Sequence, residues 1–258
     1  MIKLGPAGLG GVKAAIDNLQ KLHDKGLSAC EIAFTYGVYI KNKEDAEKIG
    51  NEAKKLGIQL SIHAPYWINL NSKEKKKIEE SKKRILDCCE IGDALGAYRI
   101  VFHPGFYGGM DKEQTYQNIK NAILEMQKEI KKNKWKPELA PETTGKINVF
   151  GSVDEILKLA EETECAFCID FAHILAREKK VDYESILKKF SKYKELHIHF
   201  SGILYGEKGE RMHIKTKDNE VKSLLENLEK YAKNKNIVII NESPDPIEDS
   251  VKTLKIIN

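Results

Sequence analysis

The stretch SIHAPYWINL, residues 61–70, joins an apolar, β-prone run to a loop and places His63 at the junction. The stretch IVFHPGFYGG, residues 100–109, repeats this arrangement with His103. A proline follows each histidine within two residues, which favours a turn over further strand. If both runs are parallel strands of one sheet, the two imidazoles lie at the same edge of that sheet.

The rest of the chain repeats a strand-and-helix pattern. Short apolar runs alternate with charged segments whose apolar residues recur at three-and-four spacing, as in Ile119, Ile123 and Met126. Ser72, Asp111 and Ser152 stand where helix N-caps are expected. The predicted strands are residues 1–5, 28–34, 58–64, 98–103, 137–142, 165–170, 195–202 and 237–242. Eight such units without a linker predict an α/β protein, a single (β/α)8 TIM barrel spanning residues 1–258.

Composition places few limits on function. The 258 residues include 41% hydrophobic and 32% charged residues with a net charge of +4, as expected of a soluble globular protein. The N-terminus does not resemble a signal peptide, and no run approaches the ~20 apolar residues of a membrane span. We therefore expect a cytoplasmic monomer without a membrane partner. The five cysteines do not suggest a disulfide framework, and we expect Cys165 and Cys168 to pack in the core.

Candidate metal ligands cluster at the predicted C-terminal strand ends, where barrel enzymes carry their chemistry. Six of the seven histidines lie there or just beyond, which core packing does not require. Imidazole and carboxylate groups together suit zinc or manganese. The candidates are His63, His103, Glu142, Asp170, His173, His197, His213 and Glu242. This set is too large for one ion and predicts a polynuclear site, which is typical of enzymes that break phosphodiesters.

In the order and spacing of its motifs, the chain resembles the endonuclease IV family of apurinic/apyrimidinic endonucleases. The matching segments are HAPYWINL, FHPG, PETTGK, CIDFAH, HIHFSG, RMH and NESP. The resemblance implies a barrel with three zinc ions that incises damaged double-stranded DNA on the 5′ side of abasic sites. It assigns the first zinc to His63, His103 and Glu142, the second to Glu142, Asp170, His197 and Glu242, and the third to His173 and His213.

The same resemblance implies two further roles. Glu142 would be the catalytic residue, because the carboxylate that bridges two ions also helps to orient the nucleophile. Tyr66, three residues after His63, would bind DNA by facing the gap left by the missing base.

Two positions depart from the family pattern. The third zinc usually has an Asp-x-His pair, but Arg211 stands here in place of the aspartate. Either Glu207 or Glu210 replaces it from a differently shaped loop, or the third site is weak or empty. For Arg211 itself, either the side chain turns outward to meet a DNA phosphate, or the third ion binds weakly. His199 stands where an asparagine is usual. We expect it to support the ligands from behind, with a direct role in binding the ion as the alternative.

A second function remains open. Sugar isomerases and epimerases of the same barrel superfamily hold one divalent metal with Glu, Asp, His and Glu. Glu142, Asp170, His197 and Glu242 would suffice for this set, but His173 and His213 would have no use. Glu31, within a predicted strand, has no assigned role: it either pairs with a lysine in the core or acts at the barrel mouth.

Overall fold

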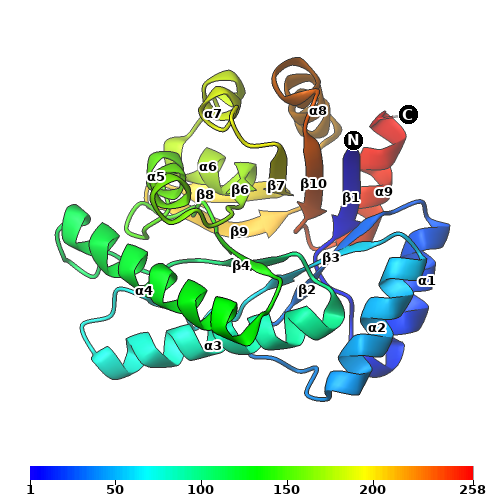
Figure 1. Cartoon of the computed structure of the whole chain (residues 1–258). Coiled ribbons are helices and arrows are strands. Elements are labelled where there is room, and N and C mark those ends of the chain that lie inside the picture. The colour runs from blue at the N-terminus through cyan, green and yellow to red at the C-terminus, as the bar shows by residue number, and fades with distance from the viewer. Residues whose placement is uncertain (258) are drawn as a thin grey trace.

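The chain folds into the predicted (β/α)8 barrel (Figure 1). The computed structural model describes residues 1–257. The barrel strands are β1 (Ile2–Pro6), β2 (Ala29–Ala33), β3 (Gln59–His63), β4 (Arg99–Phe102), β5 (Glu138–Pro141), β6 (Ile169–Asp170), β7 (Glu195–Phe200) and β10 (Asn236–Asn241). They pair in parallel in the orders β1-β10-β7-β6 and β2-β3-β4-β5. Parallel bridges from Ala7 to Glu31 and from Glu142 to Cys168 join these two sheets and close the barrel.

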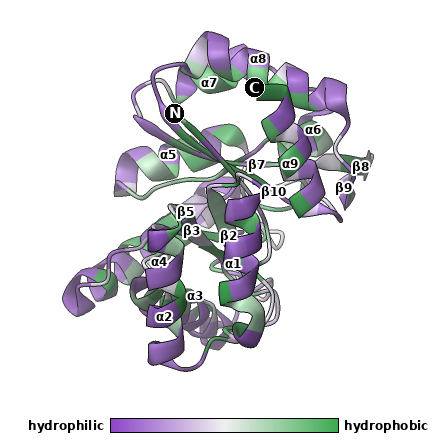
Figure 2. Ribbon diagram, turned by 90° about the vertical axis from the view of Figure 1, so that its right-hand side faces the viewer, coloured by the Kyte–Doolittle hydropathy of each residue, from purple (hydrophilic) through white to green (hydrophobic). Residues whose placement is uncertain are grey.

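Helices surround the strands. They are α1 (Ala15–Asp24) after a short 3-10 turn (Val12–Ala14), α2 (Lys43–Lys55), α3 (Lys75–Leu95), α4 (Lys112–Asn133), α5 (Val153–Thr163), α6 (Phe171–Glu178), α7 (Tyr183–Lys189), α8 (Asp218–Ala232) and α9 (Pro246–Ile257). Figure 2 shows hydrophobic residues on the strands and inner helix faces, with hydrophilic residues outside. Ile119, Ile123 and Met126 are each at most 1% exposed, as their spacing predicts.

Two of the three predicted N-caps are confirmed. Asp111 accepts bonds from the backbone of Glu113 and Gln114, and Ser152 forms a reciprocal capping box with Glu155. Ser72 was a wrong prediction, because α3 begins at Lys75 after a Glu74 N-cap. The Ser72 hydroxyl instead accepts a bond from the Glu74 amide in the preceding turn.

Two elements were not predicted. A hairpin of β8 (Gly202–Gly206) and β9 (Gly209–Ile214) follows β7, in a segment that we expected to be a loop. Helix α6 begins directly after β6, with Asp170 capping it through the His173 amide. All five cysteines are buried and free, as expected for packing residues. No helix within residues 1–257 has the length and apolar character to span a membrane.

Candidate metal centre

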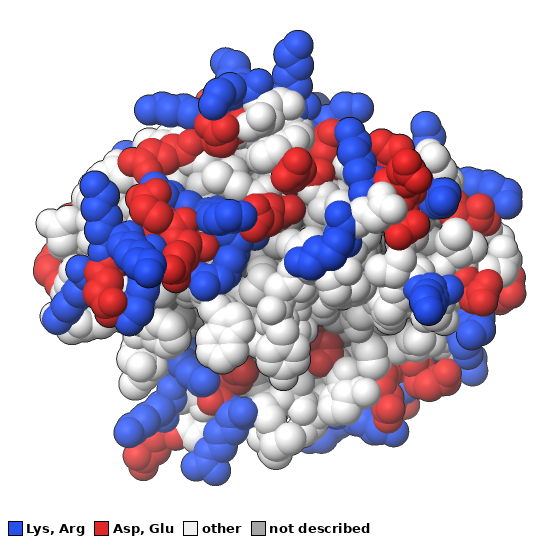
Figure 3. Space-filling model, turned by 90° about the horizontal axis from the view of Figure 1, so that it is seen from below, with Lys and Arg blue, Asp and Glu red and all other residues white. Residues whose placement is uncertain are grey.

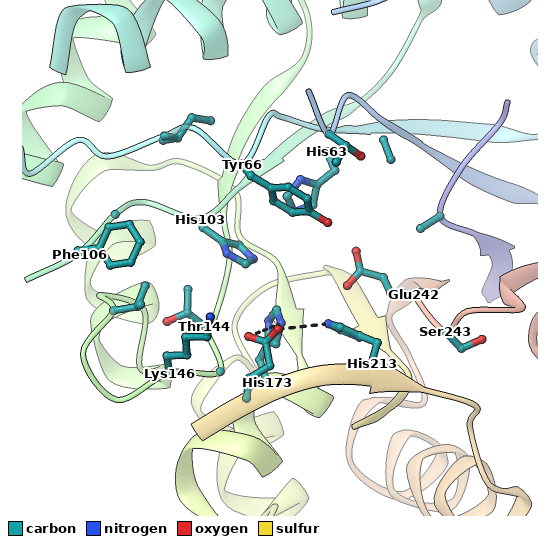
Figure 4. Close-up of a pocket in the computed structure, with 18 residues that line it drawn as sticks. His63, Tyr66, His103, Phe106, Thr144, Lys146, His173, His213, Glu242 and Ser243 are labelled. Atoms are coloured by element: carbon teal, nitrogen blue, oxygen red, sulfur yellow. Dashed lines mark ion pairs between the residues drawn. The ribbon is translucent and has the colours of Figure 1, made fainter. Parts of the chain in front are cut away.

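The candidate ligands converge at the C-terminal mouth of the barrel. His63 ends β3, and His103, Glu142 and Glu242 directly follow β4, β5 and β10. The mouth contains a cavity of about 440 Å³. Figure 4 shows the rings of His103, His173 and His213 and the Glu242 carboxylate directed into it. His103 and His173 have ring centroids 5.3 Å apart, and so do His173 and His213, so the ligand groups adjoin one another.

The first group contains His63, His103 and Glu142. The Nε2 atoms of His63 and His103 lie 3.2 Å and 3.0 Å from Glu142 Oε2. His63 Nδ1 lies 2.8 Å from the carbonyl oxygen of Ala64. Since a carbonyl can only accept, Nδ1 carries a proton and Nε2 is the nitrogen available to a cation.

The second group contains Glu142, Asp170, His199 and Glu242, with one ligand atom of each within 4.8 Å of the others. His199 Nδ1 lies 3.2 Å from Glu142 Oε1 and 3.3 Å from Glu242 Oε1. Within residues 1–257, Glu142 Oε1, Asp170 Oδ2 and His199 Nδ1 are buried without a hydrogen-bond partner. Buried polar atoms without partners are costly, and three carboxylates that converge beside an imidazole fit a divalent cation.

His197, which we predicted in this group, lies deeper in the barrel. Its Nδ1 lies 2.5 Å from the Tyr98 hydroxyl and its Nε2 lies 3.1 Å from Glu31 Oε2. Side chains two residues apart on a strand share a face, so His197 and His199 both point inward but at different depths. The structure therefore brings His199, and not His197, together with Glu142, Asp170 and Glu242.

The third group contains His173, Glu210 and His213. His173 Nε2 lies 3.5 Å from Glu210 Oε2, and His213 Nε2 lies 3.9 Å from Glu210 Oε1. The Nδ1 atoms of the two histidines lie 3.0 Å from the Thr143 carbonyl oxygen and 2.6 Å from the Ser201 hydroxyl. Glu207 and Glu210 were the two candidates to replace the aspartate of the Asp-x-His pair. The structure brings Glu210 to His173 and His213.

Arg211 does not point into this group. Tyr205 pairs with Glu210 and Leu204 pairs with Met212, so Arg211 is the extra residue of a β-bulge. Its guanidinium lies over Gly206, where an added Cβ would come within 2.9 Å of the Arg211 Nε atom. Arg211 is exposed and is therefore free to meet a partner outside the cavity.

The electrostatics also favour a cation. Burial alone would raise the pKa of Glu142, but His103 and His199 hold that pKa well below its usual range. Burial opposes ionisation of Glu242 as well, yet His199 lowers its pKa to about 2. Burial raises the pKa of Asp170, and attraction to His173 does not offset it. Two of these carboxylates are thus anionic at neutral pH in a confined space.

The rim of the mouth is rich in exposed apolar side chains. Tyr66 is 64% exposed, and its ring centroid lies 6.2 Å from that of His63. Among residues 1–257, the exposed large hydrophobic side chains other than Met1, Ile16 and Ile257 belong to mouth loops or the β8–β9 hairpin: Tyr36, Tyr39, Tyr66, Trp67, Phe106, Ile147, Leu204, Tyr205 and Met212. Figure 3, which views the molecule from below Figure 1, shows a band of uncharged residues with both basic and acidic side chains along its edges.

Fold and site together define a (β/α)8 barrel with a cluster of candidate metal ligands at its mouth. The chain belongs to the family described as xylose isomerase-like TIM barrel, whose model matches residues 19–256.

Sequence relatives include two informative proteins. The chain is 38% identical over 259 aligned residues to the Uncharacterized protein MJ0133 of Methanocaldococcus jannaschii, covering 95% of this chain and 91% of the relative. It is 24% identical to a Probable endonuclease 4 of Aquifex aeolicus, covering 58% of this chain and 55% of the relative. The second match confirms the resemblance to the endonuclease IV family over about half of the chain.

Solved structures show the same fold. SacUVDE superposes with a TM-score of 0.75 at 17% identity, covering 100% of this chain and 98% of its own. A D-tagatose 3-epimerase-like protein gives a TM-score of 0.72 at 18% identity, covering 99% and 95%. Endonuclease IV from Thermus thermophilus gives a TM-score of 0.70 at 18% identity, covering 98% and 97%. Both endonucleases and epimerases thus share this barrel, and the fold alone does not choose between them.

Proposed function

We propose that the protein is a zinc-dependent endonuclease that hydrolyses the phosphodiester on the 5′ side of abasic sites in double-stranded DNA. The observation that carries this proposal is the position of Glu142. Its Oε2 faces His63 and His103, while its Oε1 faces His199. A carboxylate with one oxygen in each of two ligand groups is suited to bridge two cations, and the third group adjoins both.

The ligand chemistry supports zinc. The first and third groups each contain two imidazoles and one glutamate, a set that catalytic zinc sites use. Backbone carbonyls fix His63 and His173 with Nε2 directed inward, and Ser201 contacts Nδ1 of His213 on the side away from Glu210. Bound zinc ions would polarise the phosphoryl group and stabilise negative charge on the departing oxygen. Glu142 would hold the reacting centre between the first two groups.

The rim supports DNA as the substrate. Aromatic rings can fill the space of a missing base or stack on its neighbours, and Tyr66 stands beside His63 at the cavity edge. Lys146 also lines the cavity, where its charge can contact a phosphate. Arg211 is exposed on the hairpin outside the cavity and would contact a phosphate further along the duplex.

The second candidate is a sugar isomerase or epimerase. Glu142, Asp170, His199 and Glu242 alone form a set for one divalent ion, which favours that reaction. An isomerase or epimerase would have no use for the four histidines of the first and third groups, His63, His103, His173 and His213. We therefore rank this function second.

Elemental analysis of the purified protein separates the two proposals. About three zinc ions per chain support the endonuclease, whereas one ion per chain together with epimerisation of a ketose supports the alternative. Incision of abasic DNA by the zinc-loaded protein then tests the activity itself.

A further inference from the structure

A buried carboxylate lies beneath the second ligand group. Glu31, in the middle of β2, is fully buried. Its Oε2 accepts hydrogen bonds from the Ser61 hydroxyl at 2.8 Å and from His197 Nε2 at 3.1 Å. Its Oε1 lies 3.0 Å from His199 Nε2. A charge at this depth is costly unless paired, so these neighbours account for its presence in the core.

The contacts on Oε2 fix the carboxylate. The Glu31 carboxylate can only accept, so His197 donates to it from Nε2. The other ring nitrogen, Nδ1, then accepts a bond from the Tyr98 hydroxyl. Because two donors occupy Oε2, the remaining oxygen of Glu31 is held toward His199.

His199 lies between Glu31 and the second ligand group. Nε2 faces Glu31, and the opposite nitrogen, Nδ1, faces Glu142 and Glu242 at 3.2 Å and 3.3 Å. Glu31 Oε1 and His199 Nε2 are both buried without a hydrogen-bond partner, so their 3.0 Å approach is an ion-pair contact. A proton on Nε2 that faces this carboxylate would leave the Nδ1 lone pair directed at the position of a cation.

We propose that Glu31 is a positioning residue, which holds Nε2 of His199 so that Nδ1 binds the cation of the second group. This inference rests on the proposed metal centre but not on its DNA substrate. It gives Glu31 a role at the mouth without contact with the ion, and it explains why a carboxylate lies in a strand interior.

The test is metal retention in the full-length protein carrying Glu31→Gln. The amide keeps the side-chain shape but removes the charge, and loss of such a supporting partner typically weakens metal binding about 10- to 100-fold. We expect faster release of one zinc ion to a chelator, measured by elemental analysis and by a chromogenic indicator. Glu125→Gln, on the exposed surface of α4, is the matched control: it makes the same chemical change outside the ligand groups, and we expect it to leave zinc release unchanged.

A spectroscopic readout separates positioning from a purely structural role. After Co²⁺ substitution, the visible absorption of Glu31→Gln should differ from that of the wild type, because the imidazole that binds the ion is reoriented. Thermal unfolding shows whether the variant is folded. If Glu31→Gln does not fold, Glu31→Asp decides, because it keeps the charge but withdraws the carboxylate from His199 and should also weaken zinc binding.

Two results would overturn the inference. Wild-type zinc release and Co²⁺ absorption in the folded variants would mean that Glu31 only balances charge in the core. Release of an ion other than that of the second group, for example one held by Cys168, His197 and His199, would mean that Glu31 does not act through Nδ1 of His199. A protein whose zinc retention depends on Glu31 but which leaves abasic DNA intact would contradict the proposed function alone.

Discussion

Glu210 and His213 face the same ion-binding group although three positions separate them on one strand. Their Oε1 and Nε2 atoms lie 3.9 Å apart. In a regular strand, residues three apart point to opposite faces. The bulge at Arg211 adds one unpaired residue, which restores both side chains to one face. A Glu-x-x-His sequence with a bulge is therefore the geometric equivalent of the Asp-x-His pair that the resemblance led us to expect.

This relationship predicts the behaviour of the third group. Glu210→Gln should speed the release of one zinc ion to a mild chelator, because an amide is a weaker ligand than a carboxylate. Arg211→Asp is the matched control and should leave release unchanged, since position 211 points away from the group. A gain in zinc retention in Arg211→Asp would show that Glu210 does not serve as the ligand.

Glu142→Gln should have the largest effect of any single substitution at the mouth. It removes the charge that faces two ligand groups at once, so we expect fewer bound ions and about 100-fold or greater loss of DNA incision. Elemental analysis and a nicking assay measure the two effects. Glu125→Gln, on the exposed surface of α4, is the control. Near-normal incision by Glu142→Gln would mean that the metal centre lies elsewhere.

Tyr66→Ala should weaken binding to abasic DNA without changing the metal content. Loss of one aromatic contact with a nucleotide typically costs about 1–3 kcal/mol, so we expect affinity for abasic duplex to fall about 5-fold or more. Tyr66→Phe keeps the ring and should bind nearly as well as the wild type. Equal losses for abasic and intact duplex would show that Tyr66 does not recognise the gap.

The metal-free protein should lose stability between neutral and alkaline pH. Burial alone would lower the pKa of His63, but its bond to Glu142 raises that pKa from 6.5 to about 9. Because the pKa of His63 is higher in the folded state, protonation of His63 stabilises the folded protein fully below pH 6.5. This contribution is lost as the pH rises through about 9. The expected loss is about 3 kcal/mol.

Chemical denaturation of the metal-free protein at pH 6 and pH 9.5 measures this change, with His63→Gln as the reference. The wild type should lose more stability than the variant over this range. Equal losses in both proteins would assign the pH dependence to other groups.

Much of the fold was predictable because apolar strands and amphipathic helices leave periodic patterns in the sequence. The β8–β9 hairpin was not, because its residues are largely polar or exposed and its pairing depends on the bulge at Arg211. His197 and His199 show a second limit. Alternation places both side chains inside the barrel, but depth along the axis is set by how neighbouring strands are staggered. For the same reason, no sequence pattern linked Glu31 to the histidines of β7.

The most direct test of the central claim is incision of a 5′-labelled duplex that contains a tetrahydrofuran abasic analogue. The analogue has no aldehyde, so β-elimination cannot cut it and only hydrolysis is detected. We predict a single cut on the 5′ side of the analogue, leaving a 3′-hydroxyl that a polymerase extends, with activity lost on chelation and restored by zinc. An intact duplex after treatment with fully zinc-loaded protein would contradict the account.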